Sequence, residues 1–334
     1  MNGNRMIRMA IVVCVAILVI AVSVQAAGLL DGSLFGYAHA EKNTAGDADI
    51  GESVCALDIH WENGKVNLEY HSGEKIELRE SSSRPISEDM KMRWWLDGDT
   101  LRVQYAKSGL HFGWNQEKEL TVRIPEGSSF REVNISATSG DLNIPELKAE
   151  TLNLEVTSGN IRASADAKKV SVSATSGNIA MQTAAGIEAM TVGTTSGNIH
   201  VEAKDIRTLK GSSTSGDILL HADQVKTCEA GSTSGTVTIH LSEADQVNIG
   251  STSGAVSVKL EKFSSLKANT TSGGITAELP EQPGFAAQID TISGKINYTL
   301  ALAREGDRYI CGDGGADVRL GTTSGDIQLN RAEQ

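Results

Sequence analysis

One short motif returns at a nearly constant interval: "TSGNI" at Thr195–Ile199, "TSGDI" at Thr214–Ile218 and "TSGTV" at Thr233–Val237. Ser-Gly occurs ten times from residue 139 to residue 325, at intervals of 19, 18, 20, 19, 19, 19, 19, 21 and 31 residues. A fixed period near 20 residues indicates a solenoid or an array of stacked units. A propeller is the weaker alternative, because each of its blades needs about 40 residues.

Apolar residues hold fixed places around each Ser-Gly pair. They stand six and four residues before the Ser and three and five residues after it, as do Leu209, Ile218 and Leu220 around Ser215. Such alternation turns one side of a strand inward on each side of a corner. We therefore predict an all-β fold, a single-stranded parallel β-helix (β-solenoid) of about ten 19-residue coils over residues 131–330. A right-handed coil is expected, although the pattern does not fix the hand.

The Ser-Gly pairs are predicted to be the corners of these coils. The Ser shares the parity of the apolar positions and is expected to point inward, and the preceding Thr outward. The Gly is expected to allow a positive φ or a close backbone approach, and the Asn that follows it in consecutive copies should stack through its side-chain amide. The predicted corner residues are Ser139, Gly140, Ser158, Gly159, Ser176, Gly177, Ser196, Gly197, Ser215, Gly216, Ser234, Gly235, Ser253, Gly254, Ser272, Gly273, Ser293, Gly294, Ser324 and Gly325.

Residues 53–130 alternate apolar and polar residues with period 2, interrupted by turn signals such as Asn63-Gly64. We expect a β-rich N-terminal cap, or first degenerate coils, that protects the open end of the solenoid. A carbohydrate-stacking aromatic patch is the functional alternative, because this segment holds all four tryptophans, Trp61, Trp94, Trp95 and Trp114. Residues 31–52 are small, polar and without periodicity, and are predicted to be a linker.

The first 30 residues have the pattern of a targeting signal. Arg5 and Arg8 precede an uncharged stretch that continues to Leu30, which is typical of a secretory signal peptide. The stretch is also long enough to span a bilayer as an uncleaved signal anchor. We expect an apolar N-terminal helix there and an extracytoplasmic location for the rest of the chain, either secreted or anchored to the membrane.

Charge and motifs exclude several classes of function. The formal net charge of −12 opposes nucleic-acid binding, because phosphates need Lys and Arg contacts. Polysaccharide-cleaving β-helix enzymes need clustered carboxylates, whereas the acidic residues here are scattered. The sequence shows no Ser/His/Asp constellation, no H-E-x-x-H and no calcium-binding repeat. We assign no catalytic, cofactor-binding or metal residue and predict that the chain is not an enzyme.

Three local features stay open. His221 and His240 occupy the same repeat position, so they form either a metal-binding or pH-sensitive patch or two solvated polar residues. The segment Arg304–Ala316 lengthens the last interval and is either a contact loop or an excursion that covers part of the core. Cys228 reads as a packed thiol, and a Cys55–Cys311 disulfide is compatible with the sequence without being deducible from it.

Two longer stretches carry a family resemblance: "LDIHWENGKVNLEYHSGEKIELRES" from Leu57 and "DRYICGDGGADVRLGTTSGDIQLN" from Asp307. Together with the T-S-G-[ND]-I repeats, they make residues 53–330 similar to the putative-adhesin, β-strand-repeat family of Gram-positive bacteria, which has no assigned biochemical activity. The resemblance implies an envelope-associated β-solenoid linked to envelope stress and surface attachment. It supplies no catalytic residues.

Two hypotheses about function follow. The first is a non-enzymatic extracytoplasmic module, an adhesin or envelope binding module, whose partner is an envelope glycan or protein. The second is a structural envelope scaffold that self-associates end to end or laterally. Under both, the N-terminal segment meets the membrane and no cofactor takes part, and a polysaccharide-active enzyme is the weakest alternative.

Ile199 and Thr195 test the inward and outward assignment. We expect Ile199→Asp to unfold the coils, because an unpaired carboxylate in an apolar core costs about 4 kcal/mol or more. Thr195→Ser should change stability by less than about 0.5 kcal/mol. Chemical denaturation of the two variants measures both, and equal stabilities would contradict the assignment.

Overall fold

A computed structural model describes residues 42–107, 116–183 and 186–332. These residues form two compact units, residues 42–183 and residues 186–332, which are considered one at a time. Their regular structure is β throughout, apart from a single 3-10 turn, η2 (Glu88–Met90). Parallel strands stacked coil on coil make up most of each unit, so the predicted all-β solenoid is the main class of the fold.

The predicted N-terminal apolar helix is wrong for this structure. No helix in the described ranges is long and apolar enough to cross a membrane, because the period-2 pattern of these residues produces strands. The segment to which we assigned the helix, residues 1–30, lies outside the described residues. Part of the predicted linker is also strand, since β1 (Thr44–Ala45) and β2 (Ala48–Ile50) pair with other strands of the first unit.

The first unit is built on β3 (Ala56–His71), β8 (Phe130–Ser158), β9 (Ile161–Ser176) and β10 (Ile179–Thr183). Each of these strands pairs in parallel with the next. The register places Asn63 opposite Ser139 and Gly64 opposite Gly140. Asn63-Gly64, which we interpreted as a turn between strands, is therefore the corner of one further coil.

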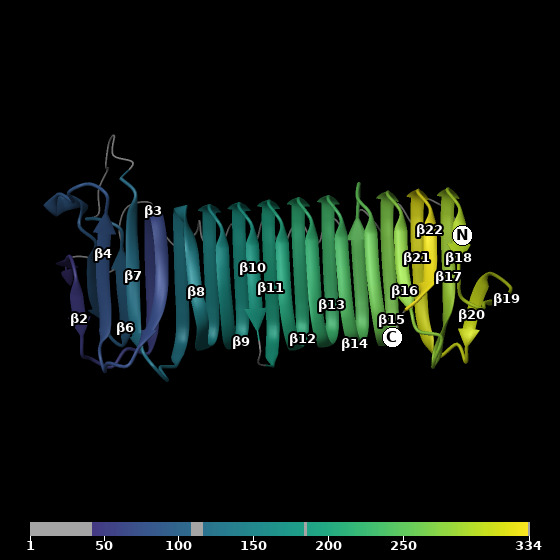
Figure 1. Cartoon of the computed structure of the whole chain (residues 1–334), viewed down its shortest axis with the longest axis horizontal. Coiled ribbons are helices and arrows are strands. Elements are labelled where there is room, and N and C mark those ends of the chain that lie inside the picture. Colours follow the sequence, from purple (N-terminus) through teal and green to yellow (C-terminus); the bar gives the residue numbers. More distant parts are fainter. Residues whose placement is uncertain (1–41, 108–115, 184–185, 333–334) are drawn as a thin grey trace. The chain divides into compact units, whose positions relative to one another are not determined.

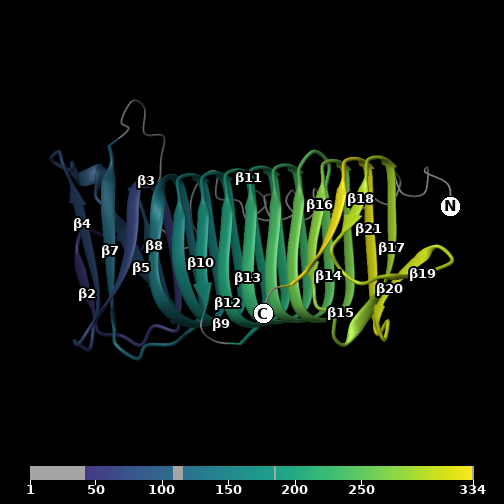
Figure 2. The same ribbon diagram turned by 45° about the vertical axis from the view of Figure 1, so that its right-hand side comes forward.

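The coils at the N-terminal end do not stack in the order of the sequence. β6 (Thr100–Gln104) and β7 (Lys118–Pro125) pair in parallel with β3, which lies between them and β8. Outside this coil, β5 (Arg93–Asp97) pairs antiparallel with β6. β4 (Ile76–Ser82) pairs antiparallel with β7, and Figure 2 shows these two strands next to each other. This antiparallel layer is a β-rich cap that covers the edge of the parallel stack.

A buried ion pair holds the cap together. The Lys118 ammonium contacts the Glu80 carboxylate, and their side chains are 0% and 4% exposed. Its Nζ also donates to the carbonyl of Met90 at 2.6 Å and lies 3.8 Å from the ring centre of Tyr105. Desolvation by burial lowers the pKa of Lys118, and the contact with Glu80 opposes that shift. Lys118 shares parity with Leu120 and Val122, so a lysine at an inward position was a signal that the sequence analysis missed.

The second unit repeats one coil with little variation. β11 (Ile187–Ser196), β12 (Ile199–Ser215), β13 (Ile218–Ser234), β14 (Val237–Ser251) and β15 (Val256–Ser272) pair in parallel, each with the next. Figure 1 shows β12 to β15 as successive ribbons side by side. Equivalent residues stack, as Ile199, Ile218 and Val237 do, and all three are buried.

The C-terminal coils also stack out of sequence order. β21 (Ala316–Ser324) pairs in parallel with β15 on one side and with β17 (Gly284–Ser293) on the other. β22 (Ile327–Arg331) likewise lies between β16 (Ile275–Leu279) and β18 (Ile296–Tyr298). The last coil of the chain is thus inserted between the two that precede it, and Figure 1 shows its yellow ribbon there.

The long last interval is a hairpin. β19 (Ala303–Glu305) and β20 (Arg308–Gly312) pair antiparallel, and β20 also pairs antiparallel with Gly284–Ala287 of β17. Cys311 in β20 is only 2% exposed. Of the two alternatives for Arg304–Ala316, the structure therefore shows the excursion that covers part of the core.

The Ser of the motif does not point inward, contrary to our prediction. All ten motif serines are exposed, and the last inward side chain before each corner lies two residues earlier, as do Ser213 and Thr270. Thr270 donates its hydroxyl to the carbonyl of Gly254, one coil back, at 3.0 Å. Parity fails here because the alternation of side chains holds only within a strand, and the chain changes direction at the corner.

The Gly of the motif is required by close approach. A Cβ on Gly216 would lie 1.9 Å from the carbonyl oxygen of Gly197, and one on Gly235 would lie 2.2 Å from that of Gly216. These distances are far below van der Waals contact, and the obstacle is backbone that cannot rotate away. These corner glycines therefore make room for the corner of the neighbouring coil.

Side chains after the Gly link successive corners. Asn160 accepts a hydrogen bond through Oδ1 from the backbone N–H of Asn178 at 3.1 Å and from its side-chain amide at 3.3 Å. Asp217 accepts one from the backbone N–H of Thr236 at 2.8 Å. The expected amide stack is present between Asn160 and Asn178, and its stronger element is the side-chain contact to the backbone of the next coil.

Variants of Gly216 and Ser215 test whether the glycine, and not the serine, is required at the corner. Gly216→Ala should destabilise the protein by about 3 kcal/mol, because the new methyl meets the Gly197 carbonyl. Ser215→Ala, at the exposed neighbouring position, should stay within about 0.5 kcal/mol of the parent. Urea unfolding of both variants measures the difference. A silent Gly216→Ala would refute the role of close approach.

The cap ion pair is tested by a double-mutant cycle. Glu80→Leu should cost about 3–5 kcal/mol, since it leaves a buried ammonium without its counter-charge. Adding Lys118→Met should recover most of that loss, because the second change removes the uncompensated charge. Thermal and urea unfolding of the two single variants and the double variant give the coupling. Additive losses would show that the pair does not act as a unit.

Candidate functional site

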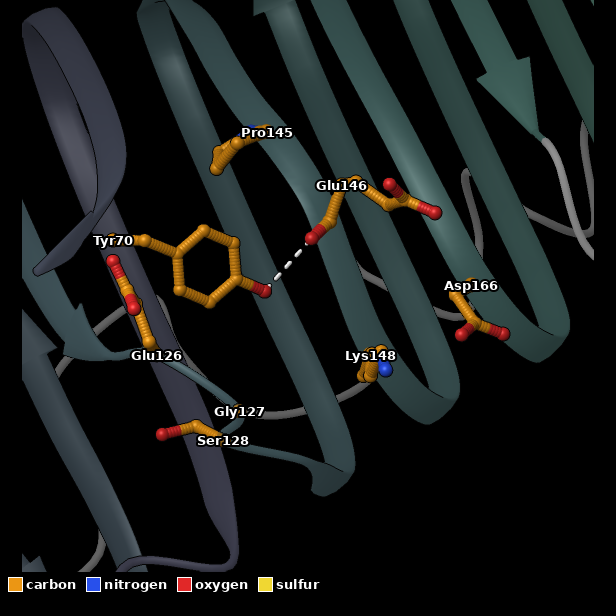
Figure 3. Close-up of a pocket in the computed structure, with 8 residues that line it drawn as sticks. All are labelled: Tyr70, Glu126, Gly127, Ser128, Pro145, Glu146, Lys148 and Asp166. Atoms are coloured by element: carbon orange, nitrogen blue, oxygen red, sulfur yellow. Dashed lines mark hydrogen bonds between the residues drawn. The ribbon is translucent and has the colours of Figure 1, made fainter. Parts of the chain in front are cut away.

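An open hollow in the first unit surrounds the ring of Tyr70, at the end of β3. It is an open depression of about 570 Å³ on the outer surface. Figure 3 shows the Tyr70 side chain lying across it, with residues from the neighbouring coils around the ring. The residues that line it are Tyr70, Glu126, Gly127, Ser128, Pro145, Glu146, Lys148 and Asp166.

A break in the regular repeat forms this hollow. Opposite β9, the register of β8 shifts between Ile144 and Glu146, so Pro145 is one extra residue in its strand. Proline has no backbone N–H to give to the ladder and is tolerated at such a bulge. A proline within a strand pattern is a signal that the sequence analysis did not use.

Tyr70 is held at the bulge by one hydrogen bond. Its hydroxyl donates to the carbonyl oxygen of Glu146 at 2.7 Å, drawn as the dashed line in Figure 3. Burial raises the pKa of the Tyr70 hydroxyl, so the group stays a neutral donor at physiological pH. Tyr70 shares the parity of Val66 and Leu68, which are buried, yet its own side chain is only half-buried.

Charged side chains line the hollow. Glu126, Glu146 and Asp166 supply three carboxylates, and Lys148 supplies one ammonium. Glu126, Glu146 and Lys148 are exposed, and Asp166 is half-buried. An aromatic surface beside several hydrogen-bond acceptors and one cationic donor suits a hydroxyl-rich or amine-bearing ligand. The excess of negative charge opposes a polyanion.

A Ser/His/Asp arrangement that the sequence did not reveal lies on another face of this unit. Nε2 of His60 lies 2.9 Å from Oδ1 of Asp58, and Nδ1 of His60 lies 2.9 Å from Oγ of Ser136. Asp58 also pairs with Arg102 of β6. His60 and Ser136 are opposite each other in the β3–β8 pair, which brings together residues far apart in the sequence.

This arrangement connects three strands on a sheet face. An attacking serine would need donors for the developing oxyanion. At this place β3 and β8 are engaged in the parallel ladder, which uses their backbone N–H groups. The geometry therefore fits a polar cross-link between β6, β3 and β8 better than a nucleophilic centre.

The remaining sequence candidates are placed as follows. His221 and His240 stack in neighbouring coils with ring centres 6.3 Å apart, and burial, then the charge of His221, lowers the pKa of His240. No group of three metal-ligating side chains occurs among the described residues. Whether the histidine pair responds to pH stays a prediction.

Two of the tryptophans are buried, and the three described cysteines are unpaired. Trp61 and Trp95 are each 2% exposed in the core of the cap, so these two rings pack inside and do not form a carbohydrate-stacking patch. Trp114 lies outside the described residues. Cys55, Cys228 and Cys311 are free thiols, so the structure contains no Cys55–Cys311 disulfide.

The solved structures to which this chain is similar include two that are described as adhesion proteins. A putative cell adhesion protein from Clostridium sporogenes is 12% identical, with 87% of this chain and 100% of that chain covered and a TM-score of 0.20. A putative adhesin from Bacteroides fragilis is 15% identical, with 66% of this chain and 97% of that chain covered and a TM-score of 0.45. Identities and scores this low do not carry function from those proteins to this one. No curated protein matches the chain.

A family model covers nearly all of the solenoid. The Toastrack DUF4097 model matches residues 54–265 and residues 244–330. These ranges include β3, every coil after it and the C-terminal insertion described above. The resemblance read from the sequence is confirmed at the level of the family: the chain belongs to the Toastrack DUF4097 family.

Proposed function

We propose that this protein is a non-enzymatic binding module that acts outside the cytoplasm and holds a glycan of the cell envelope in the hollow around Tyr70. The observation that carries the proposal is the hollow itself. The bulge at Pro145 interrupts an otherwise regular coil and exposes an aromatic ring among charged side chains. Regular coils present flat walls, whereas at this hollow a ligand would meet side chains from β3, β8 and β9 together.

The chemistry of the hollow selects the class of glycan. The Tyr70 ring offers an apolar surface for a sugar ring, while the carboxylates of Glu126, Glu146 and Asp166 accept hydrogen bonds from hydroxyl or amine groups. Three carboxylates against the one ammonium of Lys148 favour a neutral or amine-bearing glycan. The net charge of −12 adds to the repulsion of phosphate-rich polymers.

Location and adhesion are parts of the same proposal. The two arginines and the long uncharged stretch at the N-terminus are typical of a secreted chain, which supports an extracytoplasmic place of action. A surface module that holds a wall glycan would act as an adhesin does, and a role in envelope stress is compatible with it.

Tyr70 variants test glycan binding by the full-length chain in co-sedimentation with insoluble peptidoglycan. We expect Tyr70→Ala to lower the bound fraction about tenfold, since it removes the aromatic surface. Tyr70→Phe keeps the ring and loses only the hydrogen bond to Glu146, so it should bind nearly as the parent does. Glu126→Lys, at an exposed position, should weaken binding without affecting folding.

His200→Ala is the matched control, because it removes an exposed aromatic ring of the second unit that lies in neither proposed site. Its binding should equal that of the parent, and unfolding curves confirm that each variant is folded. Unchanged binding by Tyr70→Ala, or preference for a teichoic acid over peptidoglycan, would reject the glycan site. Release of soluble sugars from the pellet would reject the non-enzymatic role in favour of a polysaccharide-active enzyme.

A further inference from the structure

The coil formed by β17 and β18 ends the stack of the second unit. On one side it pairs with β21 and β22. On the other side β20 covers only Gly284–Ala287. Within the described part of the chain, no strand pairs with Gln288–Tyr298 on that side. A parallel edge with free N–H and C=O groups is a template for another strand.

Apolar side chains accompany this open edge. Ile292 and Tyr298 are the two large hydrophobic side chains exposed among the described residues, at 64% and 48%. Ile292 stands where the other nine motif copies have Thr. Tyr298 pairs in register with Leu329, which is fully buried one coil inward. The apolar column of the interior therefore reaches the surface at this end.

The charges at the edge are arranged in a self-complementary way. Asp290 and Lys295 are both exposed and lie on opposite sides of the corner at Ser293. A two-fold axis between Ile292 and Ser293 exchanges these two positions. Two copies related by this axis place each Asp290 opposite a Lys295, with the two Ile292 side chains at the centre. Isologous interfaces require this kind of self-complementarity.

We propose that this edge, Gln288–Tyr298 of β17 and β18, is an interface through which two copies of the chain associate end on. The axis exchanges position 288 with position 297, and it sets Tyr298 opposite position 287, which β20 covers. Antiparallel pairing across the axis therefore supplies backbone hydrogen-bond partners to residues 288–297 of both edges. It also removes Ile292 and Tyr298 from water, which is the driving term for association. The interface lies in the second unit and is independent of the hollow around Tyr70.

The test is sedimentation velocity of the full-length chain in a mild detergent over a wide range of concentration. The parent chain should show a monomer–dimer equilibrium. Ile292→Thr restores the residue of the other nine corners, so it should keep the fold while weakening association about tenfold or more. Asp223→Lys, an exposed charge reversal away from the edge, is the control and should associate as the parent does.

Charge exchange tests the two-fold arrangement. Asp290→Lys and Lys295→Asp should each weaken the dimer, because each places like charges opposite one another. The double variant Asp290→Lys/Lys295→Asp should recover the parent's association, since it restores the opposite pairs in reversed order. Thermal unfolding of every variant should match that of the parent.

Three results would overturn the proposal: a parent chain that is monomeric at every concentration, an Ile292→Thr dimer as strong as that of the parent, or a double variant no better than either single one. Peptidoglycan binding by Ile292→Thr is measured in parallel. Loss of the dimer with glycan binding intact, or the reverse, separates this interface from the function proposed for the Tyr70 hollow.

Discussion

The contact between stacked corners is the constraint on which the coils depend. Motif glycines approach the carbonyl of the glycine in the neighbouring coil so closely that a Cβ would lie about 2 Å from that oxygen, as at Gly216 and Gly254. A coil can therefore follow its neighbour only where a glycine stands at the same place. The hydroxyl of Thr270 and the carboxylate of Asp217 then satisfy backbone groups of the adjoining coils. The corner therefore determines the direction of the chain, the period of the repeat and the hydrogen bonds between coils.

The two proposed binding surfaces lie where the structure departs from the regular repeat. Pro145 adds a residue to its strand and opens the hollow around Tyr70. Ile292 replaces a threonine at a corner whose outer edge has no partner among the described strands. In a molecule made of near-identical coils, regular surfaces are alike on every coil, so a specific contact needs an irregular one. The glycan site and the end-on interface proposed above both rest on such departures.

The end of a solenoid needs a cap that covers its apolar interior and its open strand edge. An apolar interior ends there, and an antiparallel layer covers the outer parallel coil. The fully buried Lys118 lies among Glu80 and two aromatic rings, with each ammonium hydrogen directed at an acceptor. A buried pair of this kind contributes less to stability than an apolar substitute would, but breaking it is costly. The Lys118 ammonium links β7 to Glu80 of β4 and to the carbonyls of Met90 and Tyr105.

Period, strand pattern and corners could be predicted from the sequence because they are local: Leu209, Ile218 and Leu220 alternate around Ser215, and glycine recurs where the chain turns. The direction of Ser215 could not, because parity is lost once the backbone turns at the corner. The order in which the coils stack could not be predicted from the sequence pattern either. β21 fits between β15 and β17 because all coils present the same register, so no local signal distinguishes one neighbour from another. Asp58, His60 and Ser136, and likewise Tyr70 and Glu146, come together only when distant coils are placed side by side. Such juxtapositions are set by packing and edge pairing across the whole stack, and not by the residues next to them in the chain.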